Sequence, residues 1–389
     1  MIGRPSRRAG AAAVAALAGP AVVAVAAIYT SARNSAVAAG ALAILGTLAG
    51  DAVVLAERRW RLAVAALLLN AALVLFLLSY RSSPLPAPAP FAGPLPEASP
   101  PAGMALFRLP TGLHRRTPSF GYRGGSFLEG RDFAMSAALV RHPRGDLLID
   151  AGLSRAIDDQ MRLMPLSVRL LTGNERGETA AEQLDAAHYD RRRLAGILLT
   201  HAHWDHVSGA KDFPGTPVLL PASERRFVRE SGWICAVARS IGDERFVEYG
   251  FEGGPYLGFA ASHDVYGDGS IVSVPAPGHT PGSVIVFVAL PGGERYAFVG
   301  DLAWQLEGIT QREEKPWFTR RVADLDPSGV REELLRMAAV LERFPSMIVV
   351  PAHDSRAYAR MPALAPGVVE EEDIRAVRAL PLAYRGKPR

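Results

Sequence analysis

Six residues in the middle of the chain place three imidazoles and a carboxylate side by side. They are His201-Ala-His203-Trp-Asp205-His206, and they follow directly on the apolar run Leu194–Thr200. In extended backbone the side chains alternate, so His201 and His203 point to one side. Where the strand turns into a loop, Asp205 and His206 can point toward a neighbouring position. Because so many ionisable groups are costly to gather without a cation, the run predicts a metal site.

The side chains of this run indicate a nitrogen and oxygen site. Imidazole nitrogen and carboxylate oxygen together suit Zn, Fe, Mn or Ni. The chain has a single cysteine, Cys235, which excludes a cysteine-rich zinc site and an intrachain disulfide framework. The residues alone therefore predict a divalent metal without choosing its element.

Strand-like apolar runs alternate with helical patterns over residues 104–389. The predicted strands are Met104–Leu109, Phe133–Arg141, Asp146–Asp150, Ala195–Thr200, Pro217–Leu220, Ser270–Val274, Ser283–Leu290, Tyr296–Val299 and Ser346–Val350. The predicted helices are Thr179–Ala187, Ala222–Glu230, Pro327–Phe344 and Glu370–Leu380. Strands with interspersed helices are typical of a layered α/β fold. Residues 104–389 are therefore expected to form one catalytic domain.

Four further motifs also lie at or near the ends of apolar, strand-like runs. They are Leu148-Ile-Asp150-Ala-Gly152, Pro277-Gly-His279-Thr-Pro-Gly282, Val299-Gly-Asp301 and Val350-Pro-Ala-His353-Asp354. Together with the HxHxDH run, they resemble the metallo-β-lactamase superfamily, in the order of that family and over residues 104–360. The resemblance implies an αβ/βα sandwich of two facing sheets, with helices outside and the site at one edge.

The resemblance also implies a set of metal ligands. One metal would be held by His201, His203 and His279, a second by Asp205, His206 and His353, with Asp301 bridging both. The implied cofactors are two divalent cations, Zn2+ first, with Fe or Mn as alternatives.

Five other residues are expected to lie outside this ligand set. Asp150 is expected to orient a ligand imidazole, because a ligating histidine usually donates its other N–H. The histidines that lack motif context are expected to be ordinary, namely His114, His142, His188 and His263.

Two metals with no redox-specific ligand predict hydrolysis. Such a pair lowers the pKa of a shared water from about 16 toward about 7. The second metal polarises the carbonyl or phosphoryl oxygen and stabilises developing charge. Asp205, next to the attacking water, is the expected proton acceptor and could pass the proton to the leaving group.

The substrate is predicted less directly. The segment Tyr266–Ser270, followed by Gly278-His279-Thr280, resembles the lactonase branch of the superfamily, which opens acyl-homoserine lactones. That branch carries Tyr three residues after its bridging Asp, whereas this chain has Trp304. Asp301 argues against β-lactamase activity, because the β-lactamases of the superfamily typically lack this carboxylate. A small-molecule ester or lactone is therefore expected, with a thioester or phosphodiester as the alternative.

Two hypotheses place the protein in another functional class: a di-iron redox protein and a non-catalytic membrane sensor. The absence of a glycine-rich flavin or dinucleotide fingerprint after a strand argues against the first. The complete ligand set argues against the second. A nearby group of apolar residues could line an acyl pocket, although core packing is favoured: Trp233, Ile234, Phe246, Tyr256 and Phe259.

The basic charge of the chain is confined to its first 80 residues. They hold seven arginines against two acidic residues, so the formal net charge of +4 leaves the remainder at −1. Nucleic acids require basic surface, and a neutral body offers none. A nucleic-acid partner is therefore excluded, and no protein partner can be deduced.

Three apolar stretches lie within residues 1–80, namely 9–32, 34–56 and 62–80. A transmembrane helix needs about 20 apolar residues, and each stretch is near that length. Two spans, or a buried helical hairpin, are alternatives. A cleaved signal peptide would not explain the second and third stretches. The residues predict a membrane anchor of three helices, in which Asp51 and Asn70 serve helix packing or interfacial placement.

Arginine positions predict the orientation of this anchor. Arg4, Arg7 and Arg8 precede the first stretch, and Arg58, Arg59 and Arg61 precede the third. Basic flanks stay in the cytoplasm, so the catalytic domain is expected outside the cytoplasm of a bacterial-type plasma membrane. Residues 81–103, rich in Pro and Ala, are expected to be a semi-rigid spacer between anchor and domain.

Overall fold

The computed structural model describes residues 64, 68, 72 and 75–364. The chain divides into two compact units. The first comprises the described residues up to Ser83, with Arg115–Arg131 and Lys315–Arg320, and the second comprises the rest. Most of the predicted membrane anchor and the predicted helix Glu370–Leu380 lie outside the described residues. Among the residues that are described, none of the helices has the length and apolar character needed to cross a membrane.

Two β-sheets form the framework of the second unit. The larger has the strand order β4-β1-β2-β3-β5-β6-β7, and the smaller has the order β12-β11-β10-β9-β8. The strands are β1 (Ala105–Arg116), β2 (Arg131–Arg141), β3 (Asp146–Ile149), β4 (Glu175–Arg176), β5 (Leu194–Leu198), β6 (Val218–Pro221), β7 (Phe246–Tyr249), β8 (His263–Asp264), β9 (Ile271–Pro275), β10 (Val284–Ala289), β11 (Arg295–Gly300) and β12 (Ile348–Pro351). All nine predicted strands are present, while the short strands β4, β7 and β8 were not predicted.

Most helices are short and connect the strands. They are α4 (Pro118–Gly121), α5 (Ile157–Met161), α6 (Leu166–Leu171), α7 (Ala180–Ala186), α8 (Trp204–Val207), α9 (Ala222–Glu230), α10 (Ala236–Arg239), α11 (Leu306–Thr310), α12 (Trp317–Ala323), α13 (Pro327–Arg343) and α14 (Ser355–Tyr358). Single 3-10 turns occur at Arg191–Arg193, Ser208–Asp212, Trp233–Cys235 and Asp243–Arg245. The sequence predicted α7, α9 and α13 to within one residue at each end.

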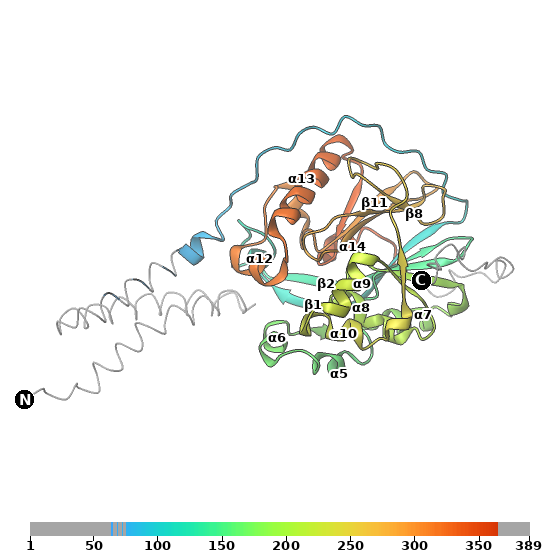
Figure 1. Ribbon diagram of the computed structural model, residues 1–389, viewed down its shortest axis with the longest axis horizontal. Helices are drawn as coiled ribbons and strands as arrows, with labels where there is room; N and C mark the ends of the chain where they lie inside the picture. Colours follow the sequence, from blue (N-terminus) through green and yellow to red (C-terminus); the bar gives the residue numbers. More distant parts are fainter. Residues whose placement is uncertain (1–63, 65–67, 69–71, 73–74, 365–389) are drawn as a thin grey trace, which may run out of the picture. The chain divides into compact units, whose positions relative to one another are not determined.

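Side chains along the strands alternate between two cores. In β10, Val284 and Val286 belong to the apolar core shared by the two sheets, whereas Ile285 and Phe287 belong to the core under the helices outside. This period of two is what a strand buried on both faces requires. The layers are therefore helix, sheet, sheet and helix (Figure 1), which confirms the predicted sandwich for the described residues.

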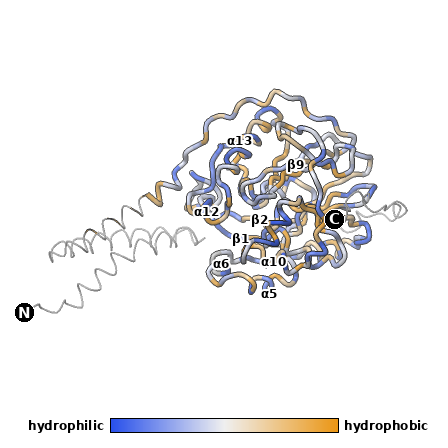
Figure 2. Tube along the Cα trace, viewed as in Figure 1, coloured by the Kyte–Doolittle hydropathy of each residue, from blue (hydrophilic) through white to orange (hydrophobic). Residues whose placement is uncertain are grey.

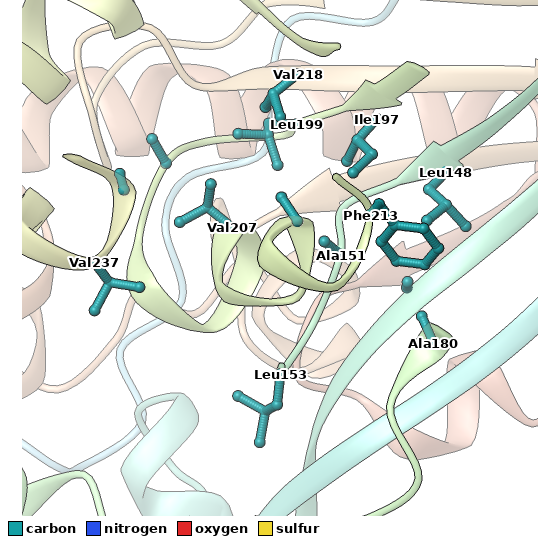
Figure 3. Packing of buried hydrophobic residues seen from close by; sticks show 14 of the residues in the cluster. Leu148, Ala151, Leu153, Ala180, Ile197, Leu199, Val207, Phe213, Val218 and Val237 are labelled. Atoms are coloured by element: carbon teal, nitrogen blue, oxygen red, sulfur yellow. The ribbon is translucent and has the colours of Figure 1, made fainter. Parts of the chain in front are cut away.

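The outer face of each sheet is closed by helices. On the smaller sheet, α13 buries Leu334 and Met337, and hydrophobic and hydrophilic residues alternate along its trace (Figure 2), as an amphipathic helix requires. On the larger sheet, Leu148 and Ile197 pack in one cluster with Phe213 (Figure 3).

The Pro-rich segment after Pro84 lies along the second unit. The backbone N–H of Leu85 donates to the carbonyl of Arg312 at 2.8 Å, and the Arg312 Nε donates back to the Leu85 carbonyl at 3.2 Å. Further along, the Phe91 ring meets the Phe344 ring edge-on at 6.2 Å. Leu85 thus belongs to the apolar core beneath α13, and Phe91 packs against that core. The expectation that residues 81–103 form a semi-rigid spacer stays a prediction.

The single cysteine is a core residue. Cys235 has no exposed surface and packs in the same cluster as Val228 and Val237. Burial raises the pKa of its thiol to about 12. Because the thiolate is the reactive form, the folded protein should protect this side chain.

Thiol labelling checks this packing. Native protein at about pH 8 should react with a thiol reagent only slowly, and denaturant should release one reactive thiol per chain, the single cysteine of the sequence. Rapid stoichiometric labelling of the native protein would contradict the burial of Cys235.

Candidate metal centre

Strand ends from both sheets bring the motifs to one place. In the larger sheet β3 and β5 run parallel, so Asp150 and His201 leave it at the same edge. In the smaller sheet β11 and β12 run parallel, and Asp301 and His353 follow their carboxyl ends. The carboxyl ends of parallel strands are where open α/β sheets form their binding sites.

The first ligand group consists of His201, His203, His279 and Asp301, all buried. The Nε2 atoms of His201 and His279 lie 3.1 Å and 2.9 Å from the same atom, Nδ1 of His203. A neutral imidazole nitrogen offers either one proton or one lone pair, so Nδ1 can satisfy only one of these contacts well. A divalent cation among the three nitrogens would accept a lone pair from each of them. The arrangement of these three imidazole nitrogens therefore fits a metal ion better than a set of hydrogen bonds.

The second ligand group consists of Asp205, His206 and His353, which the sequence also singled out. Within each group the candidate ligand atoms all lie within 4.8 Å of one another. The Nε2 of His353 is 3.5 Å from the Asp205 Oδ2. The structure thus brings all seven predicted ligands together, in the two sets that the resemblance implied.

Asp301 faces both groups with separate oxygens. Its Oδ2 lies 3.2 Å from the Nε2 of His279 and 3.9 Å from that of His201. Its Oδ1 lies 3.1 Å from the Nε2 of His353 and 3.3 Å from that of His206. One carboxylate oxygen directed at each group is the arrangement expected of a bridging ligand.

Burial and neighbouring charges set the protonation of these side chains. Burial lowers the pKa of His201 well below its ordinary value, and the nearby His206 imidazole lowers it further. Burial alone would also lower the pKa of His206, but the Asp150 and Asp301 carboxylates hold it well above the usual value. Although burial would raise the pKa of Asp301, the imidazoles around it, His353 first, hold it well below its usual range. The Asp301 carboxylate is therefore ionised.

Asp150 orients His206 from behind. Its Oδ2 lies 2.8 Å from the His206 Nδ1, and its two oxygens also accept from the backbone N–H and hydroxyl of Thr200, at 2.7 and 2.8 Å. These contacts hold Asp150 at a φ of +54°, which is uncommon for a residue other than glycine. The prediction that Asp150 positions an imidazole is confirmed.

Two more imidazoles are oriented by groups that the sequence did not reveal. The Nδ1 of His279 lies 2.9 Å from Oδ1 of Asp324, whose side chain is fully buried. The His353 Nδ1 donates to the carbonyl of Ala134 at 2.7 Å, which leaves its Nε2 facing the site. No motif surrounds Asp324 or Ala134, so only the folded chain identifies these partners.

Trp304 contacts both halves of the site. Its Nε1 donates to the Asp301 Oδ2 at 2.8 Å, and its ring meets the His353 ring edge-on at 5.6 Å. In the sequence, Trp304 was notable only because the lactonase branch has a tyrosine at this position. In the structure its polar hydrogen is directed at the carboxylate between the two groups.

The other sequence candidates lie elsewhere. Among the described residues, neither ligand group includes His114, His142, His188 or His263. The apolar residues offered as a pocket divide between two cores, with Phe246 in one and Phe259 in the other, while Trp233 is 46% exposed. Core packing is therefore confirmed for Phe246 and Phe259.

The family of the chain follows from comparison. The family model described as the metallo-beta-lactamase superfamily matches residues 130–353, more than half of the chain. The chain therefore belongs to the metallo-β-lactamase superfamily. The enzyme class predicted from the sequence, a metal-dependent hydrolase of this superfamily, agrees with that membership.

The chain matches two named relatives over only part of each relative's length. A protein named "Probable metallo-hydrolase" from Mycobacterium tuberculosis is 30% identical over 193 residues, which make up 46% of this chain and 61% of that protein. The N-acyl homoserine lactonase AttM of Agrobacterium fabrum is 24% identical over 173 residues, or 43% of this chain and 65% of AttM. The matched stretches thus span less than two thirds of either relative.

A solved structure shares the fold. An N-acyl homoserine lactone hydrolase, with its product N-hexanoyl-L-homoserine bound at the catalytic metal center, superposes with a TM-score of 0.53 and 16% identity. The match covers 66% of this chain and 96% of that one. At this identity the likeness shows the fold of the matched part alone and does not indicate a substrate.

Replacing Asp324 tests the support behind His279. Asp324→Asn should lower metal affinity about 10–100-fold, because losing a carboxylate behind a ligating histidine has that effect. Competition with a chelator measures the affinity. Asp326→Asn is the matched control, since Asp326 is exposed and caps α13, where asparagine serves equally well. Equal affinity in all three proteins would contradict the role of Asp324.

Proposed function

We propose that this chain is a membrane-anchored hydrolase that uses two divalent cations, Zn2+ first among them, to open a carboxylic ester, with a lactone as the leading substrate. The observation that carries the proposal is Asp301, which directs one carboxylate oxygen at each ligand group. A single-metal site would not need a carboxylate in this position.

The chemistry divides between the cations and the chain. Held by the two ligand groups, a pair of divalent cations would lower the pKa of water toward neutrality and would polarise the scissile carbonyl. Asp205 retains some exposure, with 11% of its side chain accessible, whereas the other six candidate ligands are buried. It can therefore take a proton from the attacking water and return one to the leaving alkoxide. The imidazoles are held by Asp150, Asp324 and the Ala134 carbonyl, so the site needs little rearrangement during the reaction.

Two observations favour a lactone as the substrate. The AttM relatives are named N-acyl homoserine lactonases, and the residues beyond 80 carry a net charge near neutral, which does not suit polyanions. Trp304 stands where the lactonase-like branch has a tyrosine, so no phenol at this position can donate to the substrate. A thioester or phosphodiester is the alternative for the same site.

Asp301→Ala tests the bridging role. Loss of the carboxylate shared by both groups should reduce the bound metal and lower kcat/KM about 1,000-fold or more. Metal content and turnover are measured on the same preparation, with a lactone, a thioester and bis(p-nitrophenyl) phosphate as substrates. Asp326→Asn serves again as the control. Unchanged metal content and turnover in Asp301→Ala would refute the bridging role. If wild type turned over only the phosphodiester, the proposal of a carboxylic ester or lactone substrate would be refuted.

The membrane part of the proposal rests on residues 1–80 of the sequence. Their three apolar stretches and flanking arginines support an anchor that leaves the catalytic domain outside the cytoplasm. A reporter enzyme that works only outside the cytoplasm, fused after residue 100, should be active. Activity only from a reporter that works in the cytoplasm would overturn this orientation, and recovery of the full chain without membranes would overturn the anchor.

A further inference from the structure

A fully buried glutamate lies behind the first ligand group without belonging to it. Glu224 sits in the first turn of α9, directly after β6. Since β6 runs parallel to β5, its carboxyl end opens at the same edge as the site. Glu224 is absent from both ligand groups. Its carboxylate therefore has another use.

The carboxylate joins the two segments that supply three of the site's imidazoles. Its Oε1 accepts from the backbone N–H of Ala202, which lies between His201 and His203, at 2.7 Å. Its Oε2 accepts from the Thr280 hydroxyl at 2.7 Å and from the Gly282 backbone N–H at 3.0 Å. Thr280 directly follows His279. One side chain thus connects the loop 201–203 with the turn 279–282.

The contact is close as well as polar. A side chain added at Gly282 would bring its Cβ into collision with the backbone nitrogen of Glu224, so only glycine permits this approach. Each carboxylate oxygen of Glu224 also faces a backbone N–H, which cannot accept a hydrogen bond. A glutamine of the same shape would have to direct its NH2 at one of those N–H groups. The site is therefore specific for a carboxylate.

We propose that Glu224 is a positioning residue that fixes the spacing of the two segments and thereby sets the cation affinity of the first ligand group. The inference rests on the proposed function, because it assumes that this group binds a cation. Without the carboxylate, the loop and the turn would have to be ordered by the cation itself, at a cost to affinity. The second group takes its ligands from Asp205, His206 and His353, which Glu224 does not contact through these hydrogen bonds. The loss should therefore fall on one of the two sites.

Cobalt and zinc titrations of the full chain test this inference. Metal-free wild type should bind two cations, and Glu224→Gln should bind one of them about 10–100-fold more weakly. Chelator competition gives the affinities, and the visible absorption of Co2+ reports the coordination at each site independently of turnover. Glu333→Gln is the matched control, because Glu333 is a largely buried glutamate that is paired with Arg336 on α13 and belongs to neither ligand group.

A second pair of variants keeps the test decisive if Glu224→Gln fails to fold. Thr280→Val removes one of the three hydrogen bonds and should weaken the same site by a smaller factor, whereas Thr280→Ser keeps the hydroxyl and should behave as wild type. If Thr280→Val, together with Glu224→Gln where that variant folds, binds two cations as tightly as wild type, the role of Glu224 is refuted and the proposed function stands. If wild type binds no cation, the proposed function itself fails.

Discussion

The structure depends on the convergence of imidazole nitrogens around one ionised carboxylate. Asp301 is buried among five histidines, a position that is unfavourable for an anion unless positive charge is near. The contacts between His201, His203 and His279 are equally unfavourable without a shared cation, because their lone pairs compete for too few protons. The buried set is therefore stable chiefly as a metal site, and the surrounding fold serves to hold it in place.

That support comes from strand ends and from hydrogen bonds behind the ligands. The larger sheet supplies the 201–206 loop, and the smaller sheet supplies Asp301 and His353, so the centre exists only where the two sheets face each other. Behind the imidazoles, Asp150, Asp324 and a backbone carbonyl fix the orientation of the rings. Glu224 fixes the distance between segments that are far apart in sequence. Each support is a buried polar group that is hydrogen-bonded to the segment it holds.

The sequence predicted the parts of this arrangement that have local patterns. The HxHxDH run, the strand-end aspartates and the period of the strands are local patterns. They predicted the residues that the structure gathers in the two groups, and they predicted the layers of the fold. Asp324 and Glu224 could not be found this way, because each acts on residues about 20 or more positions away and sits in no motif of its own. The contacts of Leu85 and Phe91 could not be predicted for the same reason, since a Pro-rich composition describes the stiffness of a segment but not the surface against which it packs. Short strands such as β8 carry too few residues to show a period.

Anomalous X-ray scattering from metal-loaded crystals measures the central claim most directly. Data collected on either side of the absorption edge of the bound element locate each cation without reference to activity. Two peaks, one beside each oxygen of Asp301, are the predicted result. A single peak that leaves His206 and His353 without a cation, or peaks remote from Asp301, would contradict the account.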